Sequence, residues 1–540
     1  MRVTTRPRLD LDDTRQGVRT PQKIGRDQLP GNREEPADPS FMRRLLSSRA
    51  FFASLALFVI GYYAALLTSG NFVLWAPAVK PGESGASFFG FVFNSVLLHL
   101  LRGDFTVDPY AIKLEAVVRN GQIYTYFGVM PAVLRLPLVP FVDLTRIDVS
   151  PLSCCIAASL IALLNVSALR VACVLGTARA RSDVLVCALF VTLVLGGPSV
   201  SFLKPSVYQE ALLWEGVFAS AFLVLALRGL TASDGFSTRT VLLMAVVAGC
   251  CLLTRVVMAT GLYAAILALL ALRFGCEMSW CFGSTGRPIH CRRGAGLLLL
   301  SRRRFIAPLI ALALFAAAAG FINYKRFGNP LVFHDPTLQT IVRPDGVPSI
   351  ERFGEFNPRR IPYALMYYFA PVWFIHSSDG DWLFNDYRRR ELDLAEAPPS
   401  SFLITDPLMF VLAAGGFGSI LRRNHLATRH PSATRAIAAA LAVPPALMLM
   451  AFVMTFRYRM EFYPLFIFLA IIGAFGTKPE IAATRPRSAT GIFLLAIVGI
   501  IASHLVLGAY KLSPWGNLDP AHDLLQIYYT GIHGFLARWL

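Results

Sequence analysis

Three carboxylates within twelve residues are the strongest candidates for chemistry in this chain. Asp104, Asp108 and Glu115 follow a long apolar run, and Pro109 stands between the second and the third. A carboxylate beside apolar surface can act as a general base or hold a cation, because its charge has to face protein or water. The alternative is that Asp108 caps a short helix and that the other two are solvated surface acids.

Two further acids, Glu210 and Glu215, lie near the start of an otherwise apolar stretch. The helix dipole favours carboxylates in a first turn, so capping alone accounts for one of them. Glu215 is one turn deeper, where an unpaired charge is costly and has to face protein or water. Both a substrate-facing role and a structural role stay open for this pair.

Three arginines form a third set of candidates, because they stand at short turns away from the other basic residues. They are Arg255, Arg457 and Arg459. The planar guanidinium group matches the oxygens of phosphate or pyrophosphate, so recognition of such a group is one interpretation. Pairing with Glu461, with Glu210 or with lipid headgroups is the other.

These residues have to be positioned by helices that cross a membrane. Hydrophobic residues make up 55% of the 540 residues, and the mean hydropathy is +0.54. A run of about 20 apolar residues spans a bilayer as a helix. We therefore predict an all-α polytopic membrane protein with about eleven spans, near residues 50–69, 151–176, 184–198, 211–229, 240–254, 257–273, 305–322, 403–421, 436–455, 461–476 and 489–508.

Arginine and lysine crowd alternate connections between these spans, which fixes a topology. By the positive-inside rule the basic side is cytoplasmic. The predicted order is a disordered cytoplasmic arm at 1–45, a transmembrane bundle at 46–508 and an external C-terminal tail at 509–540. Two long external loops, 70–150 and 323–402, interrupt the bundle and are the places to look for function.

The first external loop contains a second apolar stretch at 85–101. Counting it as a twelfth span would place every later basic loop outside, so we predict a helix that lies in the interface or on the bundle. Residues 110–119 predict a short amphipathic helix that ends at Gly121. The segment 123–142 is interrupted by prolines and predicts a surface-lying or partly re-entrant element.

Composition excludes several classes of function. The formal charge of +18 lies in short loops beside spans, so nucleic acid is not an expected partner. The nine cysteines avoid both external loops, which argues against a disulfide framework, and Cys276, Cys281, His290 and Cys291 fit no familiar zinc spacing. Nucleotide-binding and metalloprotease motifs are missing, so no nucleotide cofactor is expected. A divalent cation stays possible.

The segment Gly121-Gln122-Ile123-Tyr124-Thr125-Tyr126-Phe127-Gly128, with Pro131 and Pro137 behind it, resembles the GT-C superfamily of integral membrane glycosyltransferases. One span followed by a large external loop with acids is similar to that superfamily as well, and the likeness extends over roughly 50–476. Four shorter segments are also similar to it, namely the helix with Tyr208, Glu210 and Trp214, the turn Leu253-Thr254-Arg255, the span exit at Asn323–Gly328, and Arg457-Tyr458 opposite Pro464. Members typically carry a catalytic Asp or Glu in the first external loop, often as an adjacent acid pair, and this chain has no adjacent pair there.

The resemblance implies transfer of a sugar from a polyprenyl-phosphate donor to a periplasmic lipid or cell-envelope glycan, with inversion, in a bacterial inner membrane. It implies a base among Glu115, Asp108 and Asp104. Binding of the donor or acceptor would then involve Arg255, Arg457, Arg459, Glu210, Tyr124 and Tyr126. A transporter or flippase of lipid-linked glycan, or a noncatalytic assembly partner, remains the alternative.

Overall fold

The computed structural model describes residues 41–75, 89–175, 183–282, 295–335, 338, 350, 352–370, 391–392, 394–395, 400–422, 429–476 and 486–512. Most of the predicted arm at 1–45 and of the tail at 509–540 lies outside these residues. The division of the chain at 45 and 509 therefore stays a prediction.

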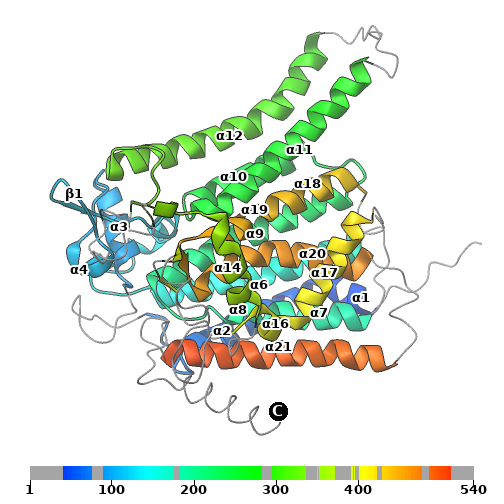
Figure 1. The fold of residues 1–540 in the computed structure, drawn as a ribbon, viewed down its shortest axis with the longest axis horizontal. Helices are drawn as coiled ribbons and strands as arrows, with labels where there is room; N and C mark the ends of the chain where they lie inside the picture. Colours follow the sequence, from blue (N-terminus) through cyan, green and yellow to red (C-terminus); the bar gives the residue numbers. More distant parts are fainter. Residues whose placement is uncertain are drawn as a thin grey trace, which may run out of the picture. The chain divides into compact units, whose positions relative to one another are not determined.

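Helices dominate the described residues, and they match the predicted spans in number and position. Nine helical segments are long and apolar enough to cross a membrane, and two shorter apolar helices accompany them. The prediction of an all-α polytopic membrane protein is therefore confirmed (Figure 1). The helices are α2 (Arg49–Leu67), α6 (Ser150–Leu175), α7 (Asp183–Leu195), α9 (Val207–Thr231), α10 (Thr238–Leu252), α11 (Val256–Phe282), α12 (Ala295–Phe327), α17 (Pro407–Leu421), α18 (Pro431–Leu441), α19 (Val443–Met450), α20 (Tyr463–Gly476) and α21 (Pro486–Leu512).

Local sequence explains where several of these helices begin or break. The hydroxyls of Ser48, Ser206 and Ser237 accept hydrogen bonds from backbone N–H groups of the first turns of α2, α9 and α10. These serines satisfy donors that the helix itself cannot pair. The pair α18 and α19 forms one span in two pieces, because Pro444 and Pro445 lack the N–H groups that would continue the ladder.

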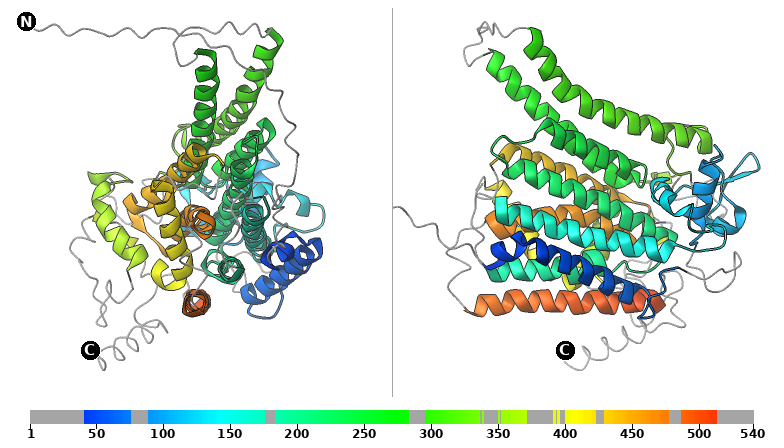
Figure 2. Two further views of the ribbon diagram at one scale, coloured as in Figure 1. Left: turned by 90° about the vertical axis from the view of Figure 1, so that its right-hand side faces the viewer. Right: turned by 180° about the vertical axis from the view of Figure 1, so that it is seen from behind.

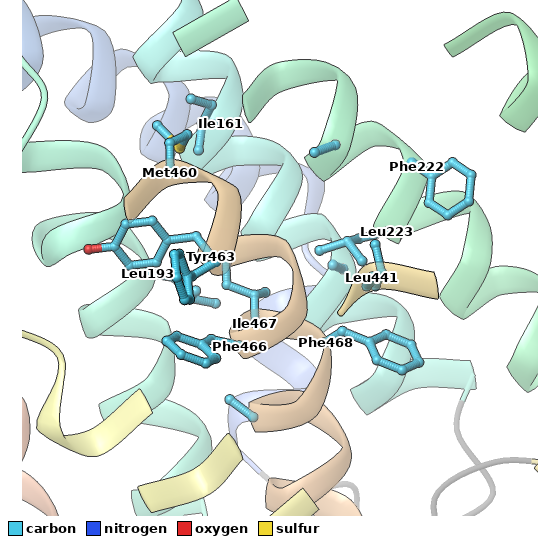
Figure 3. Packing of buried hydrophobic residues seen from close by; sticks show 14 of the residues in the cluster. Ile161, Leu193, Phe222, Leu223, Leu441, Met460, Tyr463, Phe466, Ile467 and Phe468 are labelled. Carbon is cyan, nitrogen blue, oxygen red and sulfur yellow. The ribbon is translucent and has the colours of Figure 1, made fainter. Parts of the chain in front are cut away.

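The interior of the bundle is packed around α9 and α20. Side chains of α20, among them Tyr463, Phe466 and Phe468, interdigitate with side chains from neighbouring helices (Figure 3). The backbones of α17 and α20 touch, because a Cβ on Gly416 would lie 2.0 Å from the carbonyl oxygen of Leu469. Any larger residue there would push the two helices apart.

The first external loop is a series of short elements at one end of the bundle, next to the end of α12 (Figures 1 and 2). They are α3 (Val92–Leu100), α4 (Pro109–Ile112), the 3₁₀ helix η1 (Lys113–Glu115), the strands β1 (Val117–Arg119) and β2 (Gln122–Tyr124), α5 (Met130–Val133) and η2 (Leu136–Leu138). The nine residues of α3 rise only about 14 Å, which is too short to cross a bilayer and agrees with the predicted interfacial or bundle-packed helix.

The predicted helix over 110–119 is wrong beyond Glu115. The chain enters an antiparallel hairpin in which Val117 pairs with Tyr124. Its turn residues Asn120 and Gly121 have φ angles of 52° and 74°, and an Asn-Gly pair with positive φ is the preferred two-residue hairpin turn. That turn signal outweighs the weak helical periodicity of so short a segment.

The second external loop and its neighbours contribute further short elements. They are η4 (Pro358–Arg360), α14 (Ile361–Phe369), β3 (Leu394–Ala395), α16 (Phe402–Thr405), β4 (Val453–Met454) and η6 (Phe456–Phe462). The strands β3 and β4 pair in parallel. This pairing ties the loop to the start of η6, which carries Arg457 and Arg459.

Candidate active site

Glu115 joins the first external loop to the membrane bundle. It ends η1 and is 8% exposed. Its carboxylate accepts a hydrogen bond of 2.9 Å from the hydroxyl of Tyr126, which follows β2, and another from the hydroxyl of Tyr208 in the first turn of α9. Burial raises the pKa of Tyr126, and the negative charge of Glu115 raises it further, so this hydroxyl stays a proton donor at neutral pH.

A guanidinium group also contacts Tyr208. The Cζ atom of Arg457 is 4.0 Å from the centroid of the Tyr208 ring, a distance at which a cation is attracted to the ring face. The carboxylate of Glu115 and the guanidinium group of Arg457 therefore both contact Tyr208. The centroid of the His334 ring, from the second external loop, lies 4.9 Å from that of Tyr126, which places an imidazole beside the site.

Asp104 and Asp108 belong to a separate cluster around His99. Nδ1 of His99 lies 2.9 Å from Asp104, and its Nε2 lies 3.4 Å from Asp108. Burial by itself would raise the pKa of Asp104, but hydrogen bonds from Thr106, His99 and two backbone N–H groups outweigh it and hold that pKa below its usual range. Asp104 is therefore ionised at neutral pH.

Asp108 does not cap α4 with its side chain, which corrects the capping interpretation. It occupies the N-cap position, but its carboxylate accepts a 2.6 Å hydrogen bond from the hydroxyl of Ser95 instead. Ser95 also accepts from the backbone N–H of Asp108. This reciprocal pair fastens the start of α4 to α3.

Glu210 forms a buried ion pair with Arg135, a residue that the sequence did not single out. Nη2 of Arg135 lies 2.5 Å from Glu210, and the two side chains are 2% and 0% exposed. Arg135 also donates to Asn94 and Ser150. The pair connects the first external loop to α9, and it favours the structural reading of Glu210 over contact with a substrate.

Arg255 and Arg459 both form ion pairs with acidic residues of the bundle. Arg255 lies 2.7 Å from Glu215 and 3.1 Å from Glu461. Arg459 is 1% exposed and lies 2.8 Å from Asp406. The ion-pair alternative is therefore favoured for both, and among the three candidate arginines Arg457 is the one placed beside Glu115.

The loop that carries Glu115 is anchored to the bundle through backbone contacts. The N–H of Met130 donates to the carbonyl of Leu253 at 3.0 Å, and Arg326 donates to the carbonyl of Phe127 at 2.8 Å. At Gly128 a Cβ would lie 2.3 Å from the carbonyl oxygens of Leu253 and Thr254. Only glycine permits this close approach.

Other predicted positions contribute less to the site. Tyr124 is half-buried on β2, and its backbone pairs with Val117 across the hairpin. Among the described residues, no group of three His, Cys, Asp or Glu side chains is arranged to hold a metal ion. His290 and Cys291, from the loop considered for zinc, lie outside the described residues.

Comparison with known proteins gives distant structural likenesses. No family model matches the chain, and no curated protein sequence matches it. Similar solved structures include the apo Archaeoglobus fulgidus oligosaccharyltransferase, with a TM-score of 0.42 and 15% identity, where 85% of this chain covers 56% of the other. The archaeal oligosaccharyltransferase AglB, solved with an inhibitory peptide and a dolichol-phosphate, gives a TM-score of 0.42 and 13% identity, with 87% and 56% covered.

This chain therefore spans about half the length of those proteins. At such TM-scores and identities, the likeness assigns no activity to this chain. Its function has to be inferred from the geometry of the site.

Proposed function

We propose that this protein is a membrane glycosyltransferase that transfers a sugar from a polyprenyl-phosphate donor to a periplasmic lipid or glycan acceptor with inversion. The observation that carries the proposal is the contact of both Glu115 and Arg457 with Tyr208. A base and a cation then face one reaction centre at the junction of the external loop and the bundle.

A single displacement needs these two groups. The acceptor oxygen attacks the anomeric carbon, and the bond between that carbon and the phosphate oxygen breaks with inversion. The acceptor proton passes to the carboxylate of Glu115. The departing polyprenyl phosphate carries away the bonding electrons, and the guanidinium of Arg457 stabilises its charge.

Neighbouring residues have supporting roles in this proposal. Tyr126 and Tyr208 hold the carboxylate of Glu115 in place, and Tyr124 lines the approach of the acceptor. Asp104 and Asp108 are the alternative bases, but they surround His99 rather than an arginine. We further propose a bacterial inner membrane location, with the N-terminus cytoplasmic and the C-terminus periplasmic.

The test is a transfer assay with purified protein and a panel of radiolabelled polyprenyl-phosphate sugars. Glu115→Gln keeps the size of the side chain and both hydrogen-bonded tyrosines but removes the base. We expect transfer to fall by about 10²–10⁴-fold, the usual contribution of a positioned general base. Asp104→Asn and Asp108→Asn are the matched controls, with smaller losses expected.

The outcomes of this assay distinguish Glu115 from Asp108 as the base, and an enzyme from a transporter. Near-normal turnover in Glu115→Gln removes Glu115 from the role of base, and loss in Asp108→Asn alone assigns that role to Asp108. Saturable donor binding without turnover in the wild type contradicts the enzyme proposal and points to transport of the lipid-linked glycan.

A further inference from the structure

Two carboxylates and one guanidinium meet inside the bundle, close to Arg457 of the candidate active site. Arg255, from the turn between α10 and α11, lies 2.7 Å from Glu215 on α9 and 3.1 Å from Glu461 on η6. Both glutamate side chains are 0% exposed, and that of Arg255 is 23% exposed. Three elements far apart in the sequence thus bring two negative charges onto one positive charge.

The other buried ion pairs of the bundle have matched charges. Glu210, five residues earlier on α9, is also 0% exposed and has Arg135 as its partner. Asp406 has Arg459 in the same way. The group around Arg255 therefore has one carboxylate more than these two pairs, and its two glutamate side chains are as fully buried as Glu210 and Asp406.

Further charged and titratable groups among the described residues act on the cluster. Cys251 of α10 faces both glutamates. Arg457 and Tyr458 of η6 act on Arg255, and Arg457 also contacts Tyr208 beside Glu115. Arg457 therefore lies close to both groups of residues, whereas Arg255 contacts the two glutamates directly.

The hydrogen bonds show what the cluster lacks. Within the described part of the chain, neither oxygen of Glu215 accepts a well-aligned hydrogen bond, and Oε2 of Glu461 accepts none either. The contact between Arg255 and Glu215 is an ion pair without hydrogen-bond alignment. A buried ionised carboxylate without donors costs several kcal/mol, whereas a proton between two carboxyl groups supplies both the missing donor and the missing positive charge.

We propose that Glu215 and Glu461 share one proton and form, with Arg255, a neutral proton-binding site within the bundle. This inference goes beyond glycosyl transfer and does not depend on it. One carboxyl group of the pair is protonated at neutral pH and donates to the other, and Arg255 pairs with the remaining negative charge.

Infrared spectroscopy of the purified full-length protein in lipid nanodiscs at neutral pH tests the proposal directly. A protonated carboxylic acid has its own C=O stretching band, which shifts in D₂O and on ¹³C labelling of the glutamate carboxyl groups. We expect this band in the wild type. Glu461→Gln should remove it completely, because Glu215 then pairs with Arg255 one to one and is ionised. Glu215→Gln should remove it for the same reason.

Glu210→Gln is the matched control, since it changes an equally buried glutamate of the same helix that has its own arginine. The band should persist in this variant. Wild-type protein without a ¹³C-sensitive carboxylic acid band overturns the proposal even if the variants fail to fold. So does a band that survives Glu461→Gln in folded protein, or a cluster that is ionised and needs sodium ions for stability.

Discussion

Arg457 and Arg459 are two residues apart on η6, and the structure places them in two different regions. Arg457 is half-buried over the ring of Tyr208 at the external site. Arg459 is 1% exposed, pairs with Asp406 and lies 4.0 Å from the ring of Phe402. Three residues complete a turn of 3₁₀ helix, so positions two apart point to different sides. The partner, and not the residue type, determines the role of each arginine.

Removing Arg459 should have the largest effect on stability. Arg459→Met leaves Asp406 buried without its counter-charge, and the loss of one partner of a buried pair costs about 3–5 kcal/mol. Thermal unfolding in detergent measures the loss. Adding Asp406→Asn should restore part of the stability, whereas an unchanged melting temperature in Arg459→Met would contradict the structural role.

Removing Arg457 should affect turnover and leave the fold intact. Arg457→Gln takes away the cation proposed for the leaving phosphate, and loss of such a group lowers the rate by about 10²–10³-fold. Arg457→Lys keeps the charge and should retain part of the activity. If Arg457→Gln unfolds as readily as Arg459→Met, the distinction between the two arginines fails.

Tyr126→Phe should have an intermediate effect, because it removes one of the two tyrosine hydroxyls that orient Glu115. A hydrogen bond to a charged group is worth about 1.5–3 kcal/mol, so transfer should fall by about 10- to 100-fold. The transfer assay measures it, with Tyr110→Phe in α4 of the same loop as the control. An equal loss in both variants would mean that the loop as a whole, and not the hydroxyl of Tyr126, is required.

The smallest effect is expected at Asp104. Thr106→Val removes a donor that lowers the pKa of Asp104, so that pKa should rise toward its ordinary value. Because the folded-state pKa is depressed, the stabilisation from Asp104 is present above its ordinary pKa and is lost as the pH falls. Transfer near neutral pH should be unchanged, whereas a marked loss would favour the His99 cluster over Glu115 as the source of the base.

The sequence was sufficient to predict the helices whose position depends on local hydrophobicity. Even α10, with 15 residues, and the proline-interrupted pair α18 and α19 lie where the hydropathy pattern predicts spans. The hairpin at Asn120-Gly121 was predictable too, from a turn signal that the helical interpretation overlooked.

Contacts between distant segments were not predictable in the same way. Nothing near Arg135 in the sequence indicates that its partner is Glu210, and nothing near His334 indicates Tyr126. The sequence also treats Arg255, Arg457 and Arg459 as equivalent. Their difference arises only when α9, η6 and the turn before α11 are brought together.

The contact at Gly128 has a consequence for the order in which this protein is made. Its backbone fits against Leu253 and Thr254, and the neighbouring Phe127 is held by Arg326, which lies 199 residues later. The chain is synthesised from its N-terminus, so the segment with Glu115 and Tyr126 leaves the ribosome long before these partners exist. The external site can therefore assemble only after α12 has been inserted. A chain truncated before Arg326 would keep its first spans and lack the hydrogen bond that holds the carbonyl of Phe127.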